Sequence, residues 1–254
     1  MRNGREHEHR IHYRSYLKLA IFDIDGTLAD TNKSDAECFA RAVADEFSIH
    51  EINLHWSDYE NVTDSGIAQT LYKDKFGRLP TQADIVRLKK RFFGHLRDVF
   101  DSEPVSFRQK SGASNILERS SNHSNWSIAY ATGGWHDSAI FKLQSAGLPV
   151  GQIPLSTSDD AIERTVIVSL AIERSQQSYA TKHFERTVFV GDGVWDAKTA
   201  ILLDLPFIGV GQRDQFNSFS NISVITDFVD VDRFLGLLES ASVPQTVTSH
   251  AHFA

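Results

Sequence analysis

The amino-acid sequence predicts an α/β protein built on a doubly wound parallel β-sheet, with an inserted block of helices. Short apolar runs recur along the chain at 17–22, 127–131, 152–155, 187–190 and 206–210. Runs of this length are typical of buried strands, and the stretches between most of them are long enough for a helix. Strands that alternate with helices indicate a parallel sheet with helical crossovers.

The segment 32–102 departs from this alternation, because it contains no convincing strand. Its apolar residues recur at intervals of three or four, which is the spacing of one helix face. They are Ala36, Phe39, Val43 and Phe47, followed by Ile85, Leu88, Phe92 and Leu96. We expect this segment to be a helical cap domain, inserted into an α/β core formed by 17–31 and 103–239.

The two ends of the chain have no apolar face that would organise them. Residues 1–16 are polar and contain several histidines, which leaves metal binding open, but a disordered N-terminal extension is the favoured interpretation. Residues 240–254 contain Pro244 among scattered Ser and Thr, and we expect a flexible tail.

The composition excludes several classes of protein. With 254 residues, of which 41% are hydrophobic, the chain can form a sizeable core. Its net charge of −7 provides no basic surface for nucleic acid or for an anionic membrane. We expect no signal peptide, and no apolar run reaches the roughly 18 residues of a membrane span. The single cysteine, Cys38, rules out an intrachain disulfide, so we expect a cytoplasmic protein.

The first apolar run ends in two closely spaced carboxylates, Asp23 and Asp25. Ligands of open α/β sheets bind beyond the carboxyl ends of the strands, so both carboxylates would lie at the binding edge. Two crowded aspartates are costly unless a cation or a proton-transfer role separates them. The pair alone is weak support for chemistry, because aspartates also cap turns.

Three further elements follow in a consistent order. The run 128–134 is a strand that ends in the hydroxyl of Thr132, and the next segment places Arg164 at the start of a helix. A later strand, beginning at Val188, ends in a second acidic pair, Asp192 and Asp196. Acidic and hydroxyl side chains therefore follow three separate strands.

With these elements the chain resembles the haloacid dehalogenase (HAD) superfamily over residues 18–238. The resemblance is to the phosphatase-like branch with a helical cap, which includes phosphoglycolate phosphatases. It implies that Asp23 is a nucleophile that forms an aspartyl-phosphate, and that Asp25 is the general acid and base. The presence of Asp25 argues against a true dehalogenase, which needs no such acid and no metal.

The resemblance also assigns the phosphate ligands and the catalytic cation. Thr132 would bind phosphate through its hydroxyl, and Gly133 through its main chain, because free N–H groups of a Thr-Gly-Gly turn suit a phosphate oxygen. Arg164 is the favoured cation to offset charge on the phosphoryl group. Lys142 and Lys182 are the alternatives, although Lys142 follows the second motif closely and Lys182 lies in a polar stretch.

The metal site implied by the resemblance consists of Asp23, Asp25 through its carbonyl oxygen, Asp192 and Asp196. Asp192 would bind the metal directly, whereas Asp196 would orient a metal-bound water or hold Arg164. Oxygen ligands without His or Cys nearby indicate a hard cation, and a phosphate substrate favours Mg²⁺.

Other residues near the motifs leave two interpretations open. Trp135 and Trp195 would either wall the cleft or pack the sheet edge, and a surface or capping role is favoured for His136. The segment 63–66 would reach over the phosphate from the cap, although Thr63 or Asp64 also suits an ordinary helix N-cap.

We therefore expect a Mg²⁺-dependent hydrolase that acts on a small phosphorylated metabolite, with no nucleic-acid or membrane partner. Two alternatives remain: a phosphomutase of the same fold, and a non-catalytic phosphate-binding or regulatory protein. The presence of the complete set of motif residues weighs against a non-catalytic protein. These residues are Asp23, Asp25, Thr132, Asp192 and Asp196. The motifs leave the substrate's leaving group and the oligomeric state open.

Overall fold

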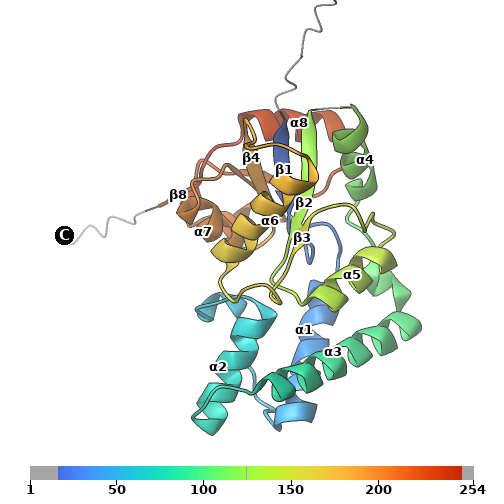
Figure 1. Ribbon diagram of the computed structural model, residues 1–254, viewed down its shortest axis with the longest axis vertical. Helices are drawn as coiled ribbons and strands as arrows, with labels where there is room; N and C mark the ends of the chain where they lie inside the picture. Colours follow the sequence, from blue (N-terminus) through green and yellow to red (C-terminus); the bar gives the residue numbers. More distant parts are fainter. Residues whose placement is uncertain (1–16, 124, 248–254) are drawn as a thin grey trace, which may run out of the picture.

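Six parallel strands form a sheet at the centre of the molecule, in the order β3-β2-β1-β4-β5-β7 (Figure 1). The computed structural model describes residues 17–123 and 125–247. The strands are β1 (Lys18–Phe22), β2 (Trp126–Ala131), β3 (Leu155–Ser156), β4 (Thr187–Gly191), β5 (Phe207–Val210) and β7 (Ser223–Ile225). From β1 to β3 the chain builds outward on one side, and it then returns to place β4 on the other side of β1. The predicted fold class, a doubly wound α/β sheet with inserted helices, is confirmed.

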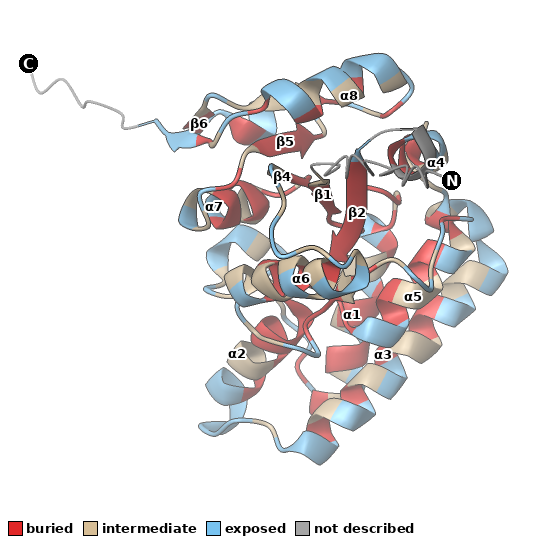
Figure 2. Ribbon diagram, turned by 45° about the horizontal axis from the view of Figure 1, so that its top comes forward, coloured by how far each residue is buried: buried red, intermediate tan, exposed pale blue. Residues whose placement is uncertain are grey.

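Helices cover both faces of the sheet. Successive residues of a strand point to opposite faces, so Ala20 and Phe22 of β1 pack on one side and Leu19 and Ile21 on the other. The first face is covered by α4 (Ala113–His123), α5 (His136–Ser145) and α8 (Val231–Ser240); the second by α6 (Arg164–Ser178) and α7 (Val194–Leu202). Burial on both sides, visible for β1 and β2 in Figure 2, explains why the strands form continuous apolar runs in the sequence.

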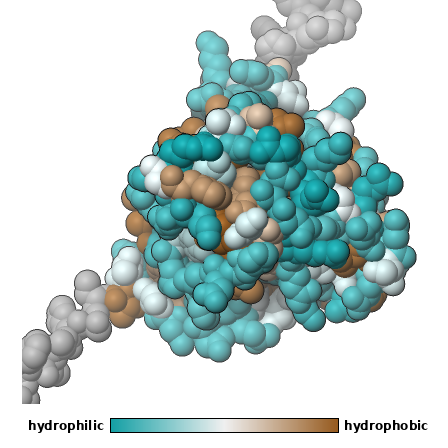
Figure 3. Space-filling model, turned by 90° about the horizontal axis from the view of Figure 1, so that it is seen from below, coloured by the Kyte–Doolittle hydropathy of each residue, from teal (hydrophilic) through white to brown (hydrophobic). Residues whose placement is uncertain are grey.

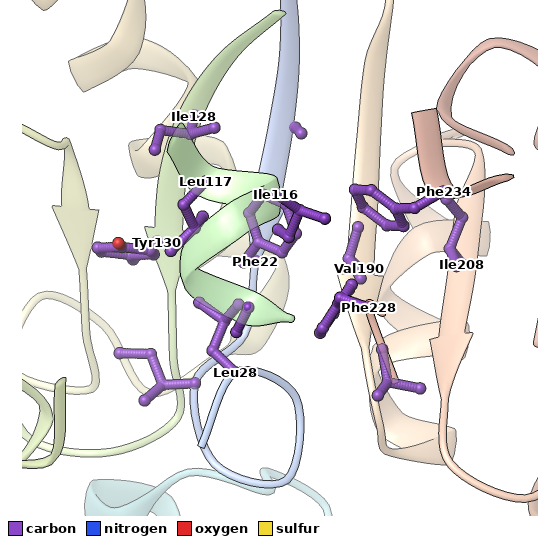
Figure 4. Close-up of a cluster of buried hydrophobic side chains, with 14 of the residues drawn as sticks. Phe22, Leu28, Ile116, Leu117, Ile128, Tyr130, Val190, Ile208, Phe228 and Phe234 are labelled. Atoms are coloured by element: carbon purple, nitrogen blue, oxygen red, sulfur yellow. The ribbon is translucent and has the colours of Figure 1, made fainter. Parts of the chain in front are cut away.

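Aromatic side chains fill much of the first face, between the sheet and α8 (Figure 4). The ring of Phe22 lies with its centroid 6.3 Å from that of Phe228 and 6.0 Å from that of Phe234. Ile116 of α4 belongs to the same buried cluster (Figure 4). Because Phe22 immediately precedes Asp23, this packing fixes the end of β1 from which the first acidic motif projects.

The segment 32–102 folds into a unit of its own, which we call the helical unit. It contains α1 (Asn32–Phe47), the 3₁₀ turn η1 (Trp56–Asp58), α2 (Asp64–Phe76) and α3 (Gln82–Ser102), and it lies beyond the carboxyl edge of the sheet (Figure 1). Predicted apolar positions such as Phe39, Leu88 and Phe92 are buried within it, together with Trp135 from the core. The helices therefore occupy the range in which the sequence predicts a cap.

Two parts of the sheet differ from the sequence prediction. The strand expected at 152–155 is observed as β3, which begins at Leu155. Pro154 has no N–H to donate and contributes only its carbonyl oxygen, which accepts a hydrogen bond from the Tyr130 N–H at 2.8 Å. The edge strand β7 was not predicted, since three residues between turns form too short a run to recognise.

The ends of the chain are described in part. Residues 1–16 and 248–254 lie outside the described residues, so the predicted N-terminal extension does too. Within the predicted tail, β8 (Gln245–Thr246) pairs antiparallel with β6 (Phe219–Ser220). Two further 3₁₀ turns are η2 (Pro104–Phe107) and η3 (Arg213–Phe216).

The surface of the helical unit has no large apolar face in the view of Figure 3. That view, from the side on which the unit lies in Figure 1, is mainly hydrophilic, with scattered apolar side chains. None of the helices in 17–123 and 125–247 is long and apolar enough to span a membrane.

Candidate active site

The acidic motifs meet where β1 and β4 end side by side. Asp23 follows β1, Asp192 follows β4, and Thr132 follows β2. The order in which strands are added to the sheet reverses between β1 and β4, and open α/β sheets bind their ligands at such a switch point. A cavity of about 80 Å³ lies here, lined by these side chains and by the facing residues of the helical unit.

Asp23 is buried and held by two donors. The Arg164 Nη2 donates to its Oδ1 at 3.1 Å, and the Thr27 hydroxyl donates to its Oδ2 at 3.3 Å. Burial, and secondly the charge of Asp196, raises the pKa of the Asp23 carboxyl well above its ordinary value, and Arg164 opposes this rise. Arg164 is the first residue of α6, as predicted, so the sequence position and the contact with the proposed nucleophile agree.

Asp192 and Asp196 complete a cluster with Asp23 in which one carboxylate oxygen of each lies within 4.8 Å of the others. Burial raises the pKa of Asp192 to about 7, with a further contribution from Asp196, although Asn32 donates to Asp192 Oδ2 at 2.7 Å. The cluster thus holds negative charge that the surrounding side chains leave uncompensated. Its donors are all carboxylate oxygens, which suit a hard divalent cation.

Asp196 differs from Asp192 because both of its oxygens already accept hydrogen bonds. Its Oδ1 accepts from Arg164 Nε at 2.7 Å, and its Oδ2 accepts from the Gly193 N–H at 3.0 Å. This arrangement fits the predicted role of holding Arg164. Arg164 in turn bridges Asp196 and Asp23, and its Nη1 donates to the Val62 carbonyl of the helical unit at 2.9 Å.

The second residue of the first motif, Asp25, is held by a different set. Its Oδ1 accepts from the Thr31 hydroxyl at 2.5 Å, and its Oδ2 accepts from Lys142 Nζ at 2.6 Å. The same ammonium donates to Asp35 Oδ1 at 2.7 Å. Lys142 is fully buried in α5, and Asp35 lies on α1, so this ion pair joins the core to the helical unit.

The contact of Lys142 with Asp25 is not predicted by the sequence, and neither is the part of Asp35. The nearness of Lys142 to the second motif disfavours it in the sequence, but α5 places its ammonium within hydrogen-bond distance of Asp25. The sequence does contain a hint that Lys142 is buried. It lies beside Leu143 and three residues after Ala139, on the buried face of α5. Burial raises the pKa of Asp35 to about 6 against the opposing charge of Lys142. The other alternative, Lys182, is exposed and does not line the cavity.

The turn after β2 brings Thr132, Gly133 and Gly134 into the cavity wall. The expectation that both glycine amides are free is wrong for Gly134, whose N–H donates to the Thr132 hydroxyl at 3.0 Å. Arg164 and the Val62 carbonyl approach the backbone of Gly133 so closely that only glycine fits. A Cβ at this position would lie 2.2 Å from Arg164 Nη1 and 2.8 Å from the Val62 carbonyl. Any side chain here would push Arg164 and the helical unit apart.

The start of α2 lines the cavity from the helical unit. Thr63 is the N-cap of α2, and its hydroxyl accepts from the Gly66 N–H at 3.1 Å. The Asp64 N–H donates to the Gly133 carbonyl at 2.8 Å, and Asp64 Oδ2 accepts from the Trp135 N–H at 3.0 Å. Thr63 is therefore the N-cap, as the second interpretation predicts, and Thr63 and Asp64 line the cavity; that the segment reaches over a phosphate stays a prediction.

The aromatic residues near the motifs have separate roles. Trp135 is 2% exposed and packs between the core and the helical unit, where its Nε1 donates to Ser65 Oγ at 2.8 Å. Trp195 lines the cavity. His136 has an exposed ring that pairs with Asp137, so its surface role agrees with the prediction.

A doubly wound parallel sheet with an acidic cluster at its carboxyl edge defines the class of protein, and comparison with known proteins identifies the family. A sequence model of the haloacid dehalogenase-like hydrolases matches residues 17–204. The protein therefore belongs to the haloacid dehalogenase-like hydrolase family, and the resemblance in its motifs and the prediction of an enzyme of this family are confirmed.

Solved structures from this family share the fold. A hydrolase from Pseudomonas syringae is 20% identical, with a TM-score of 0.64, and the match covers 88% of this chain and 99% of that one. The β-phosphoglucomutase of Clostridium difficile is 14% identical (TM-score 0.62; 88% and 98% covered). A predicted phosphoglycolate phosphatase from Haemophilus somnus is also 14% identical (TM-score 0.56; 87% and 98% covered). The comparison with curated proteins gave no match.

Proposed function

We propose that the protein hydrolyses a small phosphate monoester by way of an aspartyl-phosphate on Asp23. The placement of Asp23 carries the proposal. Its carboxylate lines a cavity, accepts a hydrogen bond from Arg164 and lies in one cluster with Asp192. A nucleophile, a cation for the phosphoryl oxygens and a set of hard metal ligands thus meet at one point.

The reaction proceeds in two displacements. A carboxylate oxygen of Asp23 attacks phosphorus, the bond from phosphorus to the ester oxygen breaks, and Asp25 gives a proton to the leaving oxygen. Water then attacks phosphorus, Asp25 takes the proton from it, and the bond to Asp23 breaks to release phosphate. Arg164 and the hydroxyl of Thr132 stabilise charge on the phosphoryl oxygens throughout.

The residues present fit Mg²⁺, since the cluster at Asp23 supplies oxygen donors alone and carries uncompensated negative charge. Asp23, Asp192 and the Asp25 carbonyl would hold the ion, with Asp196 behind them. When bound, the ion neutralises phosphoryl oxygens and so favours attack by a carboxylate.

The substrate is a small metabolite, because the cavity encloses only about 80 Å³ beneath the helical unit. We propose that the helical unit acts as a cap that opens to admit the substrate and excludes water when closed. A cytoplasmic location fits the one cysteine of the chain, Cys38, which is buried and unpaired.

A phosphomutase remains the second candidate, and the likeness to the β-phosphoglucomutase of Clostridium difficile favours it. Such an enzyme would return the phosphoryl group to a substrate hydroxyl instead of to water. Analysis of the products separates the two, because only the hydrolase releases inorganic phosphate in proportion to the substrate consumed.

The test is phosphate release from small alkyl phosphates and from p-nitrophenyl phosphate, with Mg²⁺ and with EDTA. We expect metal-dependent turnover that falls by about 10⁴-fold or more in Asp23→Asn. Asp74→Asn, on the exposed side of α2, is the matched control and should retain activity. A folded, metal-loaded protein that releases no phosphate from any of these esters would rule out the hydrolase.

A further inference from the structure

The cavity has a leaving-group half that differs from its phosphate half. The core supplies the phosphate half, around Asp23 and Arg164. The helical unit supplies the other half from α1, η1, α2 and the loop before α2, and its side chains are Asp35, Phe39, Trp56, Val62, Thr63, Asp64 and Ile67. These side chains would contact whatever alcohol the phosphate is attached to.

The leaving-group half offers no cation. Arg164 is the single cationic side chain among the described residues that line the cavity, and both Asp23 and Asp196 already engage it. Lys142 lies just behind the wall and is shared by Asp25 and Asp35. A carboxylate or a second phosphate on the leaving group would therefore meet a wall with more carboxylates than cations, which is unfavourable.

Asp64 indicates which charge the leaving group would carry. It is 8% exposed and lines the cavity, yet it forms no ion pair with any residue in the described part of the chain. Its side chain accepts a hydrogen bond from the Trp135 N–H at Oδ2. A buried carboxylate of this kind is stabilised by a cationic hydrogen-bond donor.

The other groups around Asp64 suit the same ligand. The Val62 carbonyl already accepts a hydrogen bond from Arg164 Nη1 at 2.9 Å, and the Thr63 hydroxyl donates to the Ile162 carbonyl at 2.8 Å. Phe39 and Trp56 add aromatic surface, which attracts cations and accommodates methylene groups. Acceptors and aromatic rings thus dominate this half.

We propose that the substrate is an aminoalkyl phosphate, a monoester whose leaving alcohol carries an ammonium group that pairs with Asp64. This inference rests on the proposed hydrolase function and names its substrate class. It sets the protein apart from enzymes whose leaving group carries a carboxylate or a second phosphate.

Three esters of nearly equal size test the charge preference of the leaving-group half. The leaving alcohol ends in an ammonium in 2-aminoethyl phosphate, in a neutral hydroxyl in 2-hydroxyethyl phosphate and in a carboxylate in phosphoglycolate. With Mg²⁺, kcat/KM for phosphate release should fall in that order, by about tenfold or more at each step. Equal values, or a preference for the neutral or the anionic ester, would overturn the inference and leave the hydrolase intact. Release from none of the three would overturn both.

The variant Asp64→Asn tests the assigned partner. An asparagine can still accept the hydrogen bond from Trp135, so the helical unit keeps this contact with the core. We expect the ratio of kcat/KM between the aminoethyl and hydroxyethyl esters to fall about tenfold or more, even if both values decrease. Asp74→Asn removes the same charge from the same helix outside the cavity and should leave the ratio unchanged. An unchanged ratio in Asp64→Asn contradicts the role of Asp64.

Discussion

Lys142, Asp25 and Asp35 form a buried cluster in which one cation serves two carboxylates. Desolvation of such charges is costly, and the cluster is favourable only while all three partners are present. The cluster joins the proposed general acid to the first helix of the helical unit. Within it, burial raises the pKa of the Asp35 carboxyl to about 6.

Asp35 should make the protein less stable as the pH rises from about 4 to 6. Over this range the unfolded chain loses the proton of Asp35 while the folded chain keeps it, so the unfolded state gains relative stability. A pKa of about 6 against an ordinary 3.8 corresponds to at most about 3 kcal/mol. In urea unfolding with EDTA present, the free energy of unfolding of Asp35→Asn should therefore decline less steeply with rising pH than that of the wild type. Parallel curves for the two proteins would contradict this assignment.

At the scale of single residues, the sequence predicts side chains that end strands better than those that reach the site from helix interiors. Asp23, Thr132 and Asp192 were found because each immediately follows an apolar run, and parallel strands bring such positions to one edge. Lys142 and Asp35 reach the site from α5 and α1, and their contacts depend on how the helices pack. In the sequence, the only hint of such a contact is a charged residue that falls among the apolar positions of one helix face.

Among the elements, α3 carries stabilising and destabilising features in one helix. It begins with a capping box, in which Thr81 accepts from the Asp84 N–H at 3.2 Å and Asp84 accepts from the Thr81 N–H at 2.8 Å. The hydrogen bonds from Thr81 and from Arg87 lower the pKa of the Asp84 carboxyl. Further along, Gly94 lies within the helix where a methyl group would meet open space.

Substitutions at these two positions of α3 should have opposite effects on stability. Thr81→Ala removes the N-cap acceptor and should lower the free energy of unfolding by about 1 kcal/mol. Gly94→Ala reduces the flexibility of the unfolded chain and causes no clash in the folded one. It should raise the free energy of unfolding by about 0.5–1 kcal/mol. Urea denaturation of both variants gives the comparison. A loss of stability in Gly94→Ala would show that the space beside α3 is needed by another part of the molecule.

Elements were predictable from sequence where their periodicity extends over many residues. The helices of 32–102 follow from repeated apolar spacing, and β1 and β4 from apolar runs buried on both faces. The short edge strands β3 and β7 lack such a pattern, and their pairing is set by neighbours distant in sequence. The contact between α2 and the core turn at Gly133 is tertiary and has no sequence period to reveal it.

For the whole molecule, the helical unit rests on the core through contacts around the cavity. Ser65 Oγ donates to the Ser158 carbonyl at 2.8 Å and lies 3.3 Å from Ser158 Oγ, and Lys89 pairs with Asp159. If the helical unit acts as the cap proposed above, these contacts hold it over the site, and substrate entry would require them to break.

A disulfide between Ser65→Cys and Ser158→Cys should lock this closed arrangement. The hydroxyls are close enough for the bridge to require little backbone movement. Interference from Cys38 is not expected, because burial raises the pKa of its thiol to about 11. We expect phosphate release to stop in the oxidised double variant and to return with a reductant, while Ser65→Cys alone responds to neither. Full activity of the cross-linked protein would mean that substrate enters without opening.

The position of β1 in the middle of the sheet has a consequence for biosynthesis. It is the first of the described strands in chain order, yet Lys18 pairs with Trp126 and Leu19 with Thr187, both more than a hundred residues later. Pairings this distant form slowly. The helical unit, which has its own apolar core, ends before either partner strand begins. The nascent chain therefore carries β1 without a partner strand until β2 has been translated, and shielding that apolar strand is what a chaperone would have to provide.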